Sequence, residues 1–476
     1  MSKILFVAAE ALPFASTGGL GDVIGSLPEA IVKTDKTADV RVVLPLHAKV
    51  TPEFRREMQK VAEFNVTLSW RNLYCGIWSL KKGGVTYYFV DNEYYFNRGK
   101  LYGEYDDGER YAYFCKAVLE MLPHIDFYPD VLHAHDWQSA LAVIYLRRKY
   151  NYPHIHSVYT IHNIEYQGVY SFSILGDVFD LSEADRDILE YDGDINLTKG
   201  AIVCCDKLTT VSQKYSEEIR TPFYSYGLYH IINRYAFKTM GIVNGIDYKY
   251  YNPGQDPDIA ATYSASRLLK NKAVCKAALQ EQLGLTVSPD TPMVAMITRL
   301  ASHKGVDLVK RVIDEALATE DMQFVILGTG EKAYEEFFCQ LQDRYPGKVR
   351  SLIEFNKALS KKIYAAADLF LMPSKSEPCG LSQMIASRYG AVAIVRETGG
   401  LYDTIKPFNP ETGEGNGITF VTYNAHDMLD AIRRGVSLYR SPAFKTLRKN
   451  AMTTDFSWSA SAEKYLEMYA EVEDLY

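Results

Sequence analysis

The sequence predicts an α/β protein with two doubly wound parallel sheets, and three observations support this fold class. The chain has 476 residues, more than one hydrophobic core normally accommodates, so at least two domains are expected. Short apolar runs alternate with longer helical patterns, as in βαβ units. A turn-rich stretch at Val243–Asp247 separates a first series of such units from a second. We therefore expect two domains facing a central cleft that holds the ligand.

The first series of predicted strands consists of short apolar runs bounded by turn residues. These runs are Ile4 to Ala8, Val40 to Leu44, Thr86 to Val90, Val131 to His133, Ser157 to Ile161 and Lys207 to Val211. The first run is interrupted by Glu10 and followed by Pro13, which favours a strand over a signal peptide. On this basis a first domain is expected at residues 1–241.

The second series has similar runs, which are apolar almost throughout and therefore typical of parallel strands covered on both faces. They are Gly241 to Val243, Met293 to Ile297, Gln323 to Leu327, Val349 to Ile353, Leu369 to Met372 and Val392 to Val395. The segment Ser459 to Leu475 is helical in pattern. We expect a second domain at residues 242–457 and a C-terminal helix at residues 458–476.

Composition and charge exclude several classes of protein. With 47% hydrophobic and 23% charged residues, the chain is typical of soluble globular proteins. Its net charge of -7 argues against a nucleic-acid or anionic-membrane partner, although a local basic cleft for one phosphorylated small molecule remains compatible. The seven cysteines show no paired Cys-x-x-Cys spacing, so neither a disulfide framework nor a zinc site is expected. A cytoplasmic location without a membrane span is predicted.

A lone carboxylate, Glu377, follows the predicted strand Leu369 to Met372. Ligands of parallel α/β sheets bind just beyond the carboxyl ends of the strands, so this position favours a role in chemistry. The alternative is that Glu377 caps the helix that follows.

Two cations flank the loop after the predicted strand Met293 to Ile297, namely Arg299 and Lys304. A planar guanidinium and a compact ammonium next to a helix N-terminus suit a diphosphate. Solvated surface cations are the alternative. The next strand ends in Gly328-Thr329-Gly330, a turn that would let a nucleotide lie against the backbone.

One short sequence occurs twice, as Thr17-Gly18-Gly19-Leu20 and as Thr398-Gly399-Gly400-Leu401. Each copy follows a predicted strand and precedes a predicted helix. Paired glycines there would let backbone amides approach an anion. Two similar tight turns would produce the same pattern.

The segment His133-Ala134-His135-Asp136-Trp137 contains residue types that bind zinc. In a strand, however, His133 and His135 would share one face while Asp136 points to the other. A sugar-facing hydrogen-bond cluster or a packed strand end is therefore favoured over a metal site. His162 and Asn163 follow the strand Ser157 to Ile161 and are also placed for ligand contact.

Together these segments resemble bacterial glycogen synthase and plant starch synthase. The similarity runs in order over nearly the whole chain. It is carried by Ser16 to Val23, His133 to Trp137, Thr160 to Asn163, Asn244 to Asp247, Arg299 with Lys304, Glu377 to Leu381, Thr398 to Leu401 and Asp455 to Trp458.

The resemblance implies a GT-B fold, with two Rossmann-like domains and a C-terminal helix that crosses back to the first. It also implies transfer of glucose from ADP-glucose to the non-reducing 4-hydroxyl of an α-1,4-glucan, either glycogen or a maltooligosaccharide. The anomeric configuration would be retained, and neither a metal nor a cofactor would take part. UDP-glucose as donor, or a non-catalytic glucan-binding homologue, are the alternatives.

The resemblance also implies roles for individual residues. Arg299 and Lys304 would hold the diphosphate and Glu377 would be the essential carboxylate, with His162 and Asp136 beside the transferred glucose. The other expected substrate contacts are Thr17, Gly18, Gly19, Asp22, Tyr95, Asn163, Asn244, Gly328, Phe355, Cys379, Gly380, Leu381 and Ser382. Among these, Phe355 would stack on adenine, and Tyr95 would lie on the acceptor side unless it is a core residue.

One position departs from the family pattern. Ser16 stands where the family usually has lysine before Thr-Gly-Gly-Leu. A preorganised donor to a leaving group can contribute roughly 3 kcal/mol, so its loss is expected to slow transfer about a hundredfold unless another cation substitutes.

Overall fold

The computed structural model describes residues 2–475. Its internal contacts divide the chain into two compact units. The first contains the chain up to Gly245 together with the segment from Trp458 onward, and the second contains Ile246–Ser457. Within the described residues, no helix has both the length and the apolarity that crossing a membrane requires.

The first unit is built on a nine-stranded sheet among the described residues, in the order β12-β11-β7-β6-β1-β2-β5-β4-β3. Neighbours from β12 to β5 are parallel, whereas β5, β4 and β3 form an antiparallel edge. The strands are β1 (Lys3–Val7), β2 (Asp39–Pro45), β3 (Gln59–Leu68), β4 (Arg71–Lys82), β5 (Val85–Asp91), β6 (Val131–His135), β7 (His156–Ile161), β11 (Lys207–Thr210) and β12 (Thr239–Gly241). A small separate sheet contains β8 (Val169–Tyr170), β9 (Glu190–Tyr191) and β10 (Asp194–Asn196).

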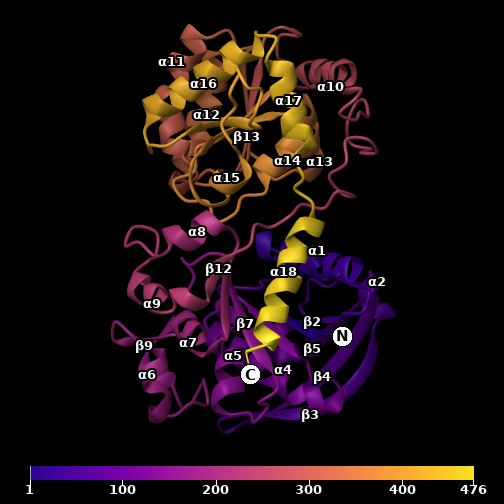
Figure 1. Cartoon of the computed structure of the whole chain (residues 1–476), viewed down its shortest axis with the longest axis vertical. Helices are drawn as coiled ribbons and strands as arrows, with labels where there is room; N and C mark the ends of the chain where they lie inside the picture. Colours follow the sequence, from indigo (N-terminus) through magenta and orange to yellow (C-terminus); the bar gives the residue numbers. More distant parts are fainter. Residues whose placement is uncertain (1, 476) are drawn as a thin grey trace. The chain divides into compact units, whose positions relative to one another are not determined.

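Helices cover both faces of the first sheet. On one face α1 (Gly19–Thr34) packs beside α18 (Trp458–Glu473), and on the other α4 (Asp107–His124) packs beside α5 (Trp137–Arg148). Figure 1 shows α18, in yellow, lying next to α1. Shorter helices complete the unit: α2 (Pro52–Glu57), α3 (Glu93–Phe96), α6 (Arg186–Leu189), α7 (Leu197–Cys204), α8 (Gln213–Glu218) and α9 (Tyr229–Arg234).

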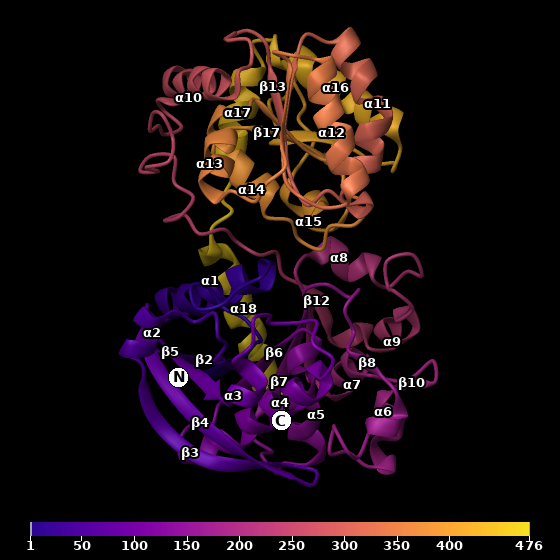
Figure 2. The same ribbon diagram turned by 180° about the vertical axis from the view of Figure 1, so that it is seen from behind.

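The second unit has an all-parallel sheet, which in the described residues follows the order β15-β14-β13-β16-β17-β18. Figure 2 shows α11, α12 and α16 on one face of this sheet and α10, α13, α14 and α17 on the other. The strands are β13 (Met293–Ile297), β14 (Gln323–Leu327), β15 (Val349–Leu352), β16 (Leu369–Met372), β17 (Val392–Arg396) and β18 (Gly417–Phe420). The helices are α10 (Leu268–Leu283), α11 (Val306–Thr319), α12 (Lys332–Arg344), α13 (Lys357–Ala366), α14 (Ser382–Arg388), α15 (Gly399–Thr404), α16 (Ala425–Tyr439) and α17 (Phe444–Thr453).

The predicted α/β class with parallel sheets is confirmed, and one predicted strand is placed in the wrong series. The sequence analysis began the second series at Gly241, whereas β12 ends there and pairs with β11 in the first sheet. The antiparallel pair β3 and β4 was missed because its residues alternate between exposed and covered positions, so no continuous apolar run forms.

Candidate active site

In the second unit, the expected donor residues lie where the strand order of the sheet reverses. β13 has β14 on one side and β16 on the other, so the chain winds away from it in both directions. The loop after β13 carries Arg299 and Lys304, and the loop after β16 carries Glu377. Ligand sites of open α/β sheets form at such switch points.

Glu377, which is buried, and Lys304, which is partly buried, form an ion pair at this switch point. The Lys304 Nζ lies 2.9 Å from Oε1 and 2.7 Å from Oε2 of Glu377, and the Ser374 hydroxyl donates to Oε2 at 2.9 Å. Glu377 is only 6% exposed. Arg299 lies exposed in the neighbouring loop and has no hydrogen-bond partner for its side chain among the described residues. The site thus contains one neutralised cation and one guanidinium available to an anion.

The capping interpretation of Glu377 is wrong. The N-cap of α14 is Leu381, and no side chain caps this helix end. The carboxylate instead points to Lys304 and Ser374, which belong to two different loops.

Glycines allow the loops of this site to interlock. A Cβ on Gly305, whose φ is 76°, would lie 2.2 Å from the Pro373 carbonyl oxygen. A Cβ on Gly399 would lie 1.9 Å from the carbonyl oxygen of Glu377, and the Gly400 amide donates to that oxygen at 3.1 Å. The second Thr-Gly-Gly-Leu copy is therefore a tight turn packed against the Glu377 loop.

The remaining predicted residues of this unit lie around the same edge of the sheet. Cys379 is buried and Gly380 has a φ of 73°, and both carbonyl oxygens accept hydrogen bonds from Gln383 in the first turn of α14. Leu381 and Ser382 follow at the start of this helix. A Cβ on Gly328 would lie 1.8 Å from the Thr298 carbonyl oxygen, so this glycine is required for loop packing. Phe355 is 83% exposed.

In the first unit, Glu10 anchors the first Thr-Gly-Gly-Leu copy. Its carboxylate accepts hydrogen bonds from the Thr17 amide at 2.6 Å, the Thr17 hydroxyl at 2.8 Å and the Gly21 amide at 3.1 Å. Burial raises the pKa of Glu10. A Cβ on Gly18 or Gly19 would meet no atom of the described residues within 4 Å, so this copy leaves open space where the second is packed. Asp22 follows in the first turn of α1.

Sequence analysis missed Glu10 as part of the site. The sequence does contain a signal, because Glu10 is a carboxylate just after the apolar run Ile4 to Ala8. This feature was used only as an argument against a signal peptide.

Asp136, His162 and Asn163 meet at the ends of β6 and β7. An Asp136 carboxylate oxygen accepts from the His162 amide at 2.8 Å, and the His162 Nε2 lies 3.0 Å from the His135 Nδ1. Asp136 retains some solvent exposure but is densely surrounded, and this burial raises its pKa to about 7. Burial lowers the pKa of His162 to about 3, so the imidazole is neutral near pH 7. The Asn163 side chain accepts from the Glu165 amide.

His133 belongs to the interior of the first unit. Its two ring nitrogens lie 2.7 Å from the Tyr469 hydroxyl and 2.6 Å from the Thr160 hydroxyl. Both nitrogens are thus occupied by hydroxyl groups. In the described part of the chain, no three His, Cys, Asp or Glu side chains are grouped to hold a metal ion.

Tyr95 does not present its ring to solvent. It is 1% exposed, and its hydroxyl donates to Glu109 at 2.5 Å within a cluster of aromatic rings. The neighbouring Tyr94 is 70% exposed. The core alternative therefore describes Tyr95 better than the expected sugar contact. Asn244 is buried near the end of the first unit, and its Oδ1 has no partner among the described residues.

An open cavity of about 480 Å³ adjoins the His162 loop in the first unit. Its walls include Trp137, Glu165, Tyr166, Tyr170 and Tyr226. Aromatic faces beside a carboxylate suit a ligand that is apolar on its faces and polar at its edges. Sequence analysis missed these rings because 36 tyrosines are spread over the chain and few of them are distinguished by pattern.

Known proteins are similar to this chain in sequence and in fold. Residues 3–234 match the starch synthase catalytic domain, and residues 281–451 match glycosyl transferases group 1. The glycogen synthase of Geobacillus thermodenitrificans is 48% identical over 99% of this chain and 98% of its own, and that of Bacillus cereus strain ATCC 10987 is 47% identical over 98% and 99%.

Solved structures agree with these relatives. The catalytic domain of starch synthase IV from Arabidopsis thaliana, bound to ADP and acarbose, superposes with a TM-score of 0.90 at 35% identity, and the match covers 99% of each chain. A sucrose-phosphate synthase from Thermosynechococcus elongatus shares the fold alone, with a TM-score of 0.60 at 16% identity. The GT-B fold and the resemblance inferred from the sequence are confirmed. The chain is an enzyme of the glycogen and starch synthase family, whose members transfer glucosyl groups in the synthesis of storage glucans.

Proposed function

We propose that this enzyme transfers glucose from ADP-glucose to the non-reducing 4-hydroxyl of an α-1,4-glucan and retains the anomeric configuration. The observation that carries this proposal is the pairing of Glu377 with Lys304 at the switch point of the second sheet. A diphosphate entering beside the exposed Arg299 competes with Glu377 for the Lys304 ammonium. Charge-assisted hydrogen bonds from both cations then stabilise the departing ADP.

When the diphosphate displaces Glu377 from Lys304, the Glu377 carboxylate becomes available to the transferred glucose. The freed carboxylate stays held by Ser374 and offsets positive charge that develops on the glucosyl ring. Retaining hydrolases use two carboxyl groups about 5 Å apart. Among the described residues, no second carboxylate hydrogen-bonds within the Glu377, Lys304 and Ser374 group. A front-face mechanism, in which the leaving phosphate oxygen takes the proton of the acceptor hydroxyl, agrees with this arrangement.

The acceptor is assigned to the first unit. The rings of Tyr166 and Tyr226 are about half exposed at the cavity that Trp137 also lines, where sugar faces can pack on them. Neutral His162 and the Asp136 carboxyl group can hydrogen-bond to sugar hydroxyls. Phe355 is available to stack on the adenine base, an interaction that any base could make in part.

The test offers ADP-glucose and UDP-glucose, each with glycogen, to the wild type and to Glu377→Gln. We expect ADP-glucose to be the better donor, and we expect the variant to lose at least a hundredfold in kcat because an amide cannot offset the developing charge. Glu336→Gln is the matched control, since Glu336 is exposed in α12 and its one ion pair among the described residues is with Lys332. Full activity in excess chelator is expected, as no step uses a metal.

Three results would contradict the proposal in different ways. A wild type that elongates glycogen with neither donor would favour a glucan-binding homologue. Preference for UDP-glucose would change the donor alone. A Glu377→Gln variant with full rate would remove Glu377 from the mechanism.

A further inference from the structure

Gln383 lies fully buried in the first turn of α14 and holds the backbone of the loop before this helix. Its Nε2 donates to the carbonyl oxygen of Cys379 at 3.1 Å and to that of Gly380 at 2.9 Å. A third acceptor, the Thr404 hydroxyl, lies 3.1 Å away and donates its own proton to the Gly400 carbonyl oxygen. Because all three neighbours accept, the Gln383 side chain must present its amide nitrogen to them and not its oxygen.

These contacts determine where two backbone N–H groups point. In a planar trans peptide, the C=O and the N–H point in opposite directions. The Cys379 carbonyl shares its peptide with the Gly380 N–H, and the Gly380 carbonyl shares its peptide with the Leu381 N–H. Since Gln383 holds both carbonyl oxygens, both N–H groups point away from its buried side chain. Gly380 and Leu381 are themselves partly exposed.

The backbone conformation of the loop brings these two N–H groups to one side. Gly380 has a φ of 73°, and Leu381 follows with the φ and ψ of a right-handed helix. Such a succession of left-handed and right-handed residues makes successive N–H groups converge. Among the described residues, neither N–H has a hydrogen-bond partner. The loop therefore offers two convergent donors to oxygen atoms of a ligand.

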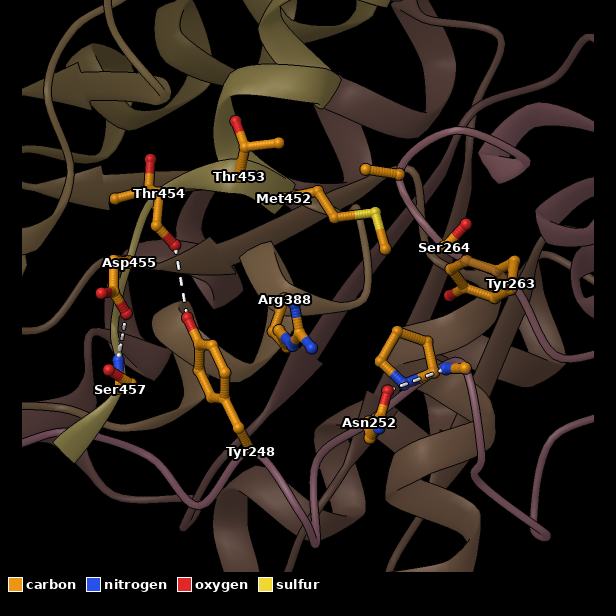
Figure 3. Close-up of a pocket in the computed structure, with 13 residues that line it drawn as sticks. Tyr248, Asn252, Tyr263, Ser264, Arg388, Met452, Thr453, Thr454, Asp455 and Ser457 are labelled. Atoms are coloured by element: carbon orange, nitrogen blue, oxygen red, sulfur yellow. Dashed lines mark hydrogen bonds between the residues drawn. The ribbon is translucent and has the colours of Figure 1, made fainter. Parts of the chain in front are cut away.

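α14 is a fixed base for Gln383, because its other end is also anchored. The guanidinium carbon of Arg388, its last residue, lies 4.2 Å from the centroid of the Tyr248 ring. The Tyr248 hydroxyl donates to the Thr454 carbonyl oxygen at 3.4 Å and accepts from the Phe456 amide at 2.8 Å. Figure 3 shows Arg388 beside Tyr248 in the wall of a cavity of about 470 Å³ that lies within the second unit. The fold of this unit thus sets the position of Gln383.

We propose that Gln383 is a positioning residue for the transferred glucose. By holding the Cys379 and Gly380 carbonyl oxygens, it aims the N–H groups of Gly380 and Leu381 at hydroxyl oxygens of the glucosyl group. Donors that are fixed in advance need no reorganisation when the ligand arrives, and these two recognise the sugar and not the nucleotide. Glu377 in the same loop is assigned to the same glucosyl group, so this role of Gln383 rests on the proposed function.

Gln383→Met tests this role, since methionine is similar in length and volume but has no hydrogen-bond donor. Calorimetric titration of the full chain in the absence of glucan measures the Kd for ADP-glucose and the Kd for ADP. We expect the ratio of these values, ADP-glucose over ADP, to rise at least tenfold in the variant, because two N–H groups lose their orientation. The Kd for ADP should stay within twofold, and kcat/KM for ADP-glucose should fall at least tenfold. A merely structural role would weaken both ligands together.

Gln280→Met is the matched control. Gln280 is also buried in a helix of the second unit, and its side chain binds the backbone amide and carbonyl oxygen of Ser288 and the Oε1 of Gln323. Gln323 begins β14, at the edge of the sheet opposite to the Glu377 loop. This variant should lower the melting temperature and leave the Kd ratio unchanged.

Gln383→Asn keeps the primary amide but is shorter by one methylene group. It should raise the ratio of the two Kd values to a smaller extent than Gln383→Met, and it serves if Gln383→Met does not fold. An unchanged ratio in the variant that folds would overturn the inference.

Donor analogues test whether the N–H groups meet hydroxyl oxygens. The measurement is kcat/KM for the 2-, 3-, 4- and 6-deoxy forms of ADP-glucose in the wild type and in Gln383→Met. For at least one analogue, the loss caused by the substitution should be at least threefold smaller than for ADP-glucose, because the N–H then has no oxygen to bind. An equal loss for all four analogues would overturn the inference.

The remaining outcomes separate this role from the proposed function. Equal weakening of ADP and ADP-glucose in Gln383→Met, or the same rise of the ratio in Gln280→Met, would overturn the role of Gln383 alone. A wild type that binds ADP-glucose but elongates no glucan would mean that the proposed function has failed, and the ratio would still decide the role of Gln383. If UDP-glucose is the donor, the same titrations use UDP-glucose and UDP. Binding of neither nucleotide sugar by the wild type would overturn both.

Discussion

Ser16 is the residue at which we expect this chain to depart from the family pattern, and its surroundings indicate what a lysine would do there. The Ser16 hydroxyl donates to the Gly18 carbonyl oxygen at 3.3 Å and packs where a Cβ on Gly21 would lie. Thr17, Gly18 and Gly19 are exposed, so a longer side chain can leave this position without entering the core. We predict that Ser16→Lys retains activity or raises kcat, because an ammonium near the leaving phosphates stabilises their charge.

Ser16→Met is the control for this variant, since methionine matches the length of lysine without its charge. A kcat that rises with lysine and not with methionine supports the electrostatic argument. A collapse of activity with lysine alone would mean that the pocket is organised around serine.

Asp136 gives a pH-dependent prediction for stability. Its pKa is about 7 in the folded chain because of burial, against about 3.9 when unfolded. Between these values the folded state binds more protons, so this group's contribution to stability is full below pH 4 and is lost as the pH rises through 7. The free energy of unfolding of Asp136→Asn should therefore rise relative to that of the wild type as the pH increases across this range. Above pH 7 this relative gain should amount to about 2–4 kcal/mol.

Thermal unfolding of both proteins from pH 4 to pH 8 measures this difference. The control is Asp187→Asn, which removes an exposed carboxylate and so separates the effect of losing a charge from the effect of burying one. A constant difference for Asp136→Asn would contradict the raised pKa.

Residues whose role depends on type and position along a strand were predictable from the sequence. Glu377, Lys304 and His162 each follow a buried strand, and parallel strands bring such positions to one edge. Tyr95 was not predictable in this way, because its burial depends on Glu109 and on rings from other elements. Glu10 was missed because its partners, Thr17 and Gly21, are backbone and hydroxyl donors that no short motif specifies.

At the scale of elements, the two Thr-Gly-Gly-Leu turns have the same sequence and different tasks. The copy at α1 leaves its glycines open, whereas the copy at α15 presses them against the Glu377 loop. Sequence alone left both interpretations open for both copies, since a glycine has no side chain whose contacts could be anticipated. What separates them is the neighbouring loop, which comes from β16 in one case only.

This difference in packing predicts different effects for alanine substitutions in the two turns. A Cβ on Gly400 would lie 2.0 Å from the Cys379 carbonyl oxygen, so Gly400→Ala should destabilise the chain by about 1–3 kcal/mol and lower kcat by displacing the Glu377 loop. Gly18 has extended backbone that any residue adopts, and nothing described lies near its Cβ position. Gly18→Ala should therefore leave the melting temperature unchanged and raise the donor KM.

Melting curves and donor kinetics on both variants separate the two tasks. Loss of stability in Gly18→Ala, or an unchanged melting temperature in Gly400→Ala, would contradict the assignment.

At the scale of the whole molecule, the sheet series and the C-terminal helix followed from local patterns, but the place of β12 did not. β12 is three residues long, and only its pairing with β11 assigns it to the first sheet. The antiparallel edge of that sheet was also not predicted, because its strands are amphipathic and contain no continuous apolar run.

The position of α18 supplies the last prediction. This helix follows the second unit in sequence, yet its buried side chains, among them Trp458, Tyr465 and Tyr469, join the core of the first. The Tyr469 hydroxyl lies 2.7 Å from the His133 Nδ1, and both residues are fully buried.

Tyr469→Phe leaves the His133 Nδ1 without a hydrogen-bond partner, which costs about 1–3 kcal/mol. Calorimetry should show a transition of the first unit lowered by about 2–4 °C for each kcal/mol, with that of the second unit unchanged. Among the residues that the structure describes, the exposed Glu471 pairs with Lys207 alone, so Glu471→Gln should move neither transition by more than about 1 °C. A shift confined to the second unit would contradict the assignment of α18, since destabilisation would then follow sequence order instead of packing.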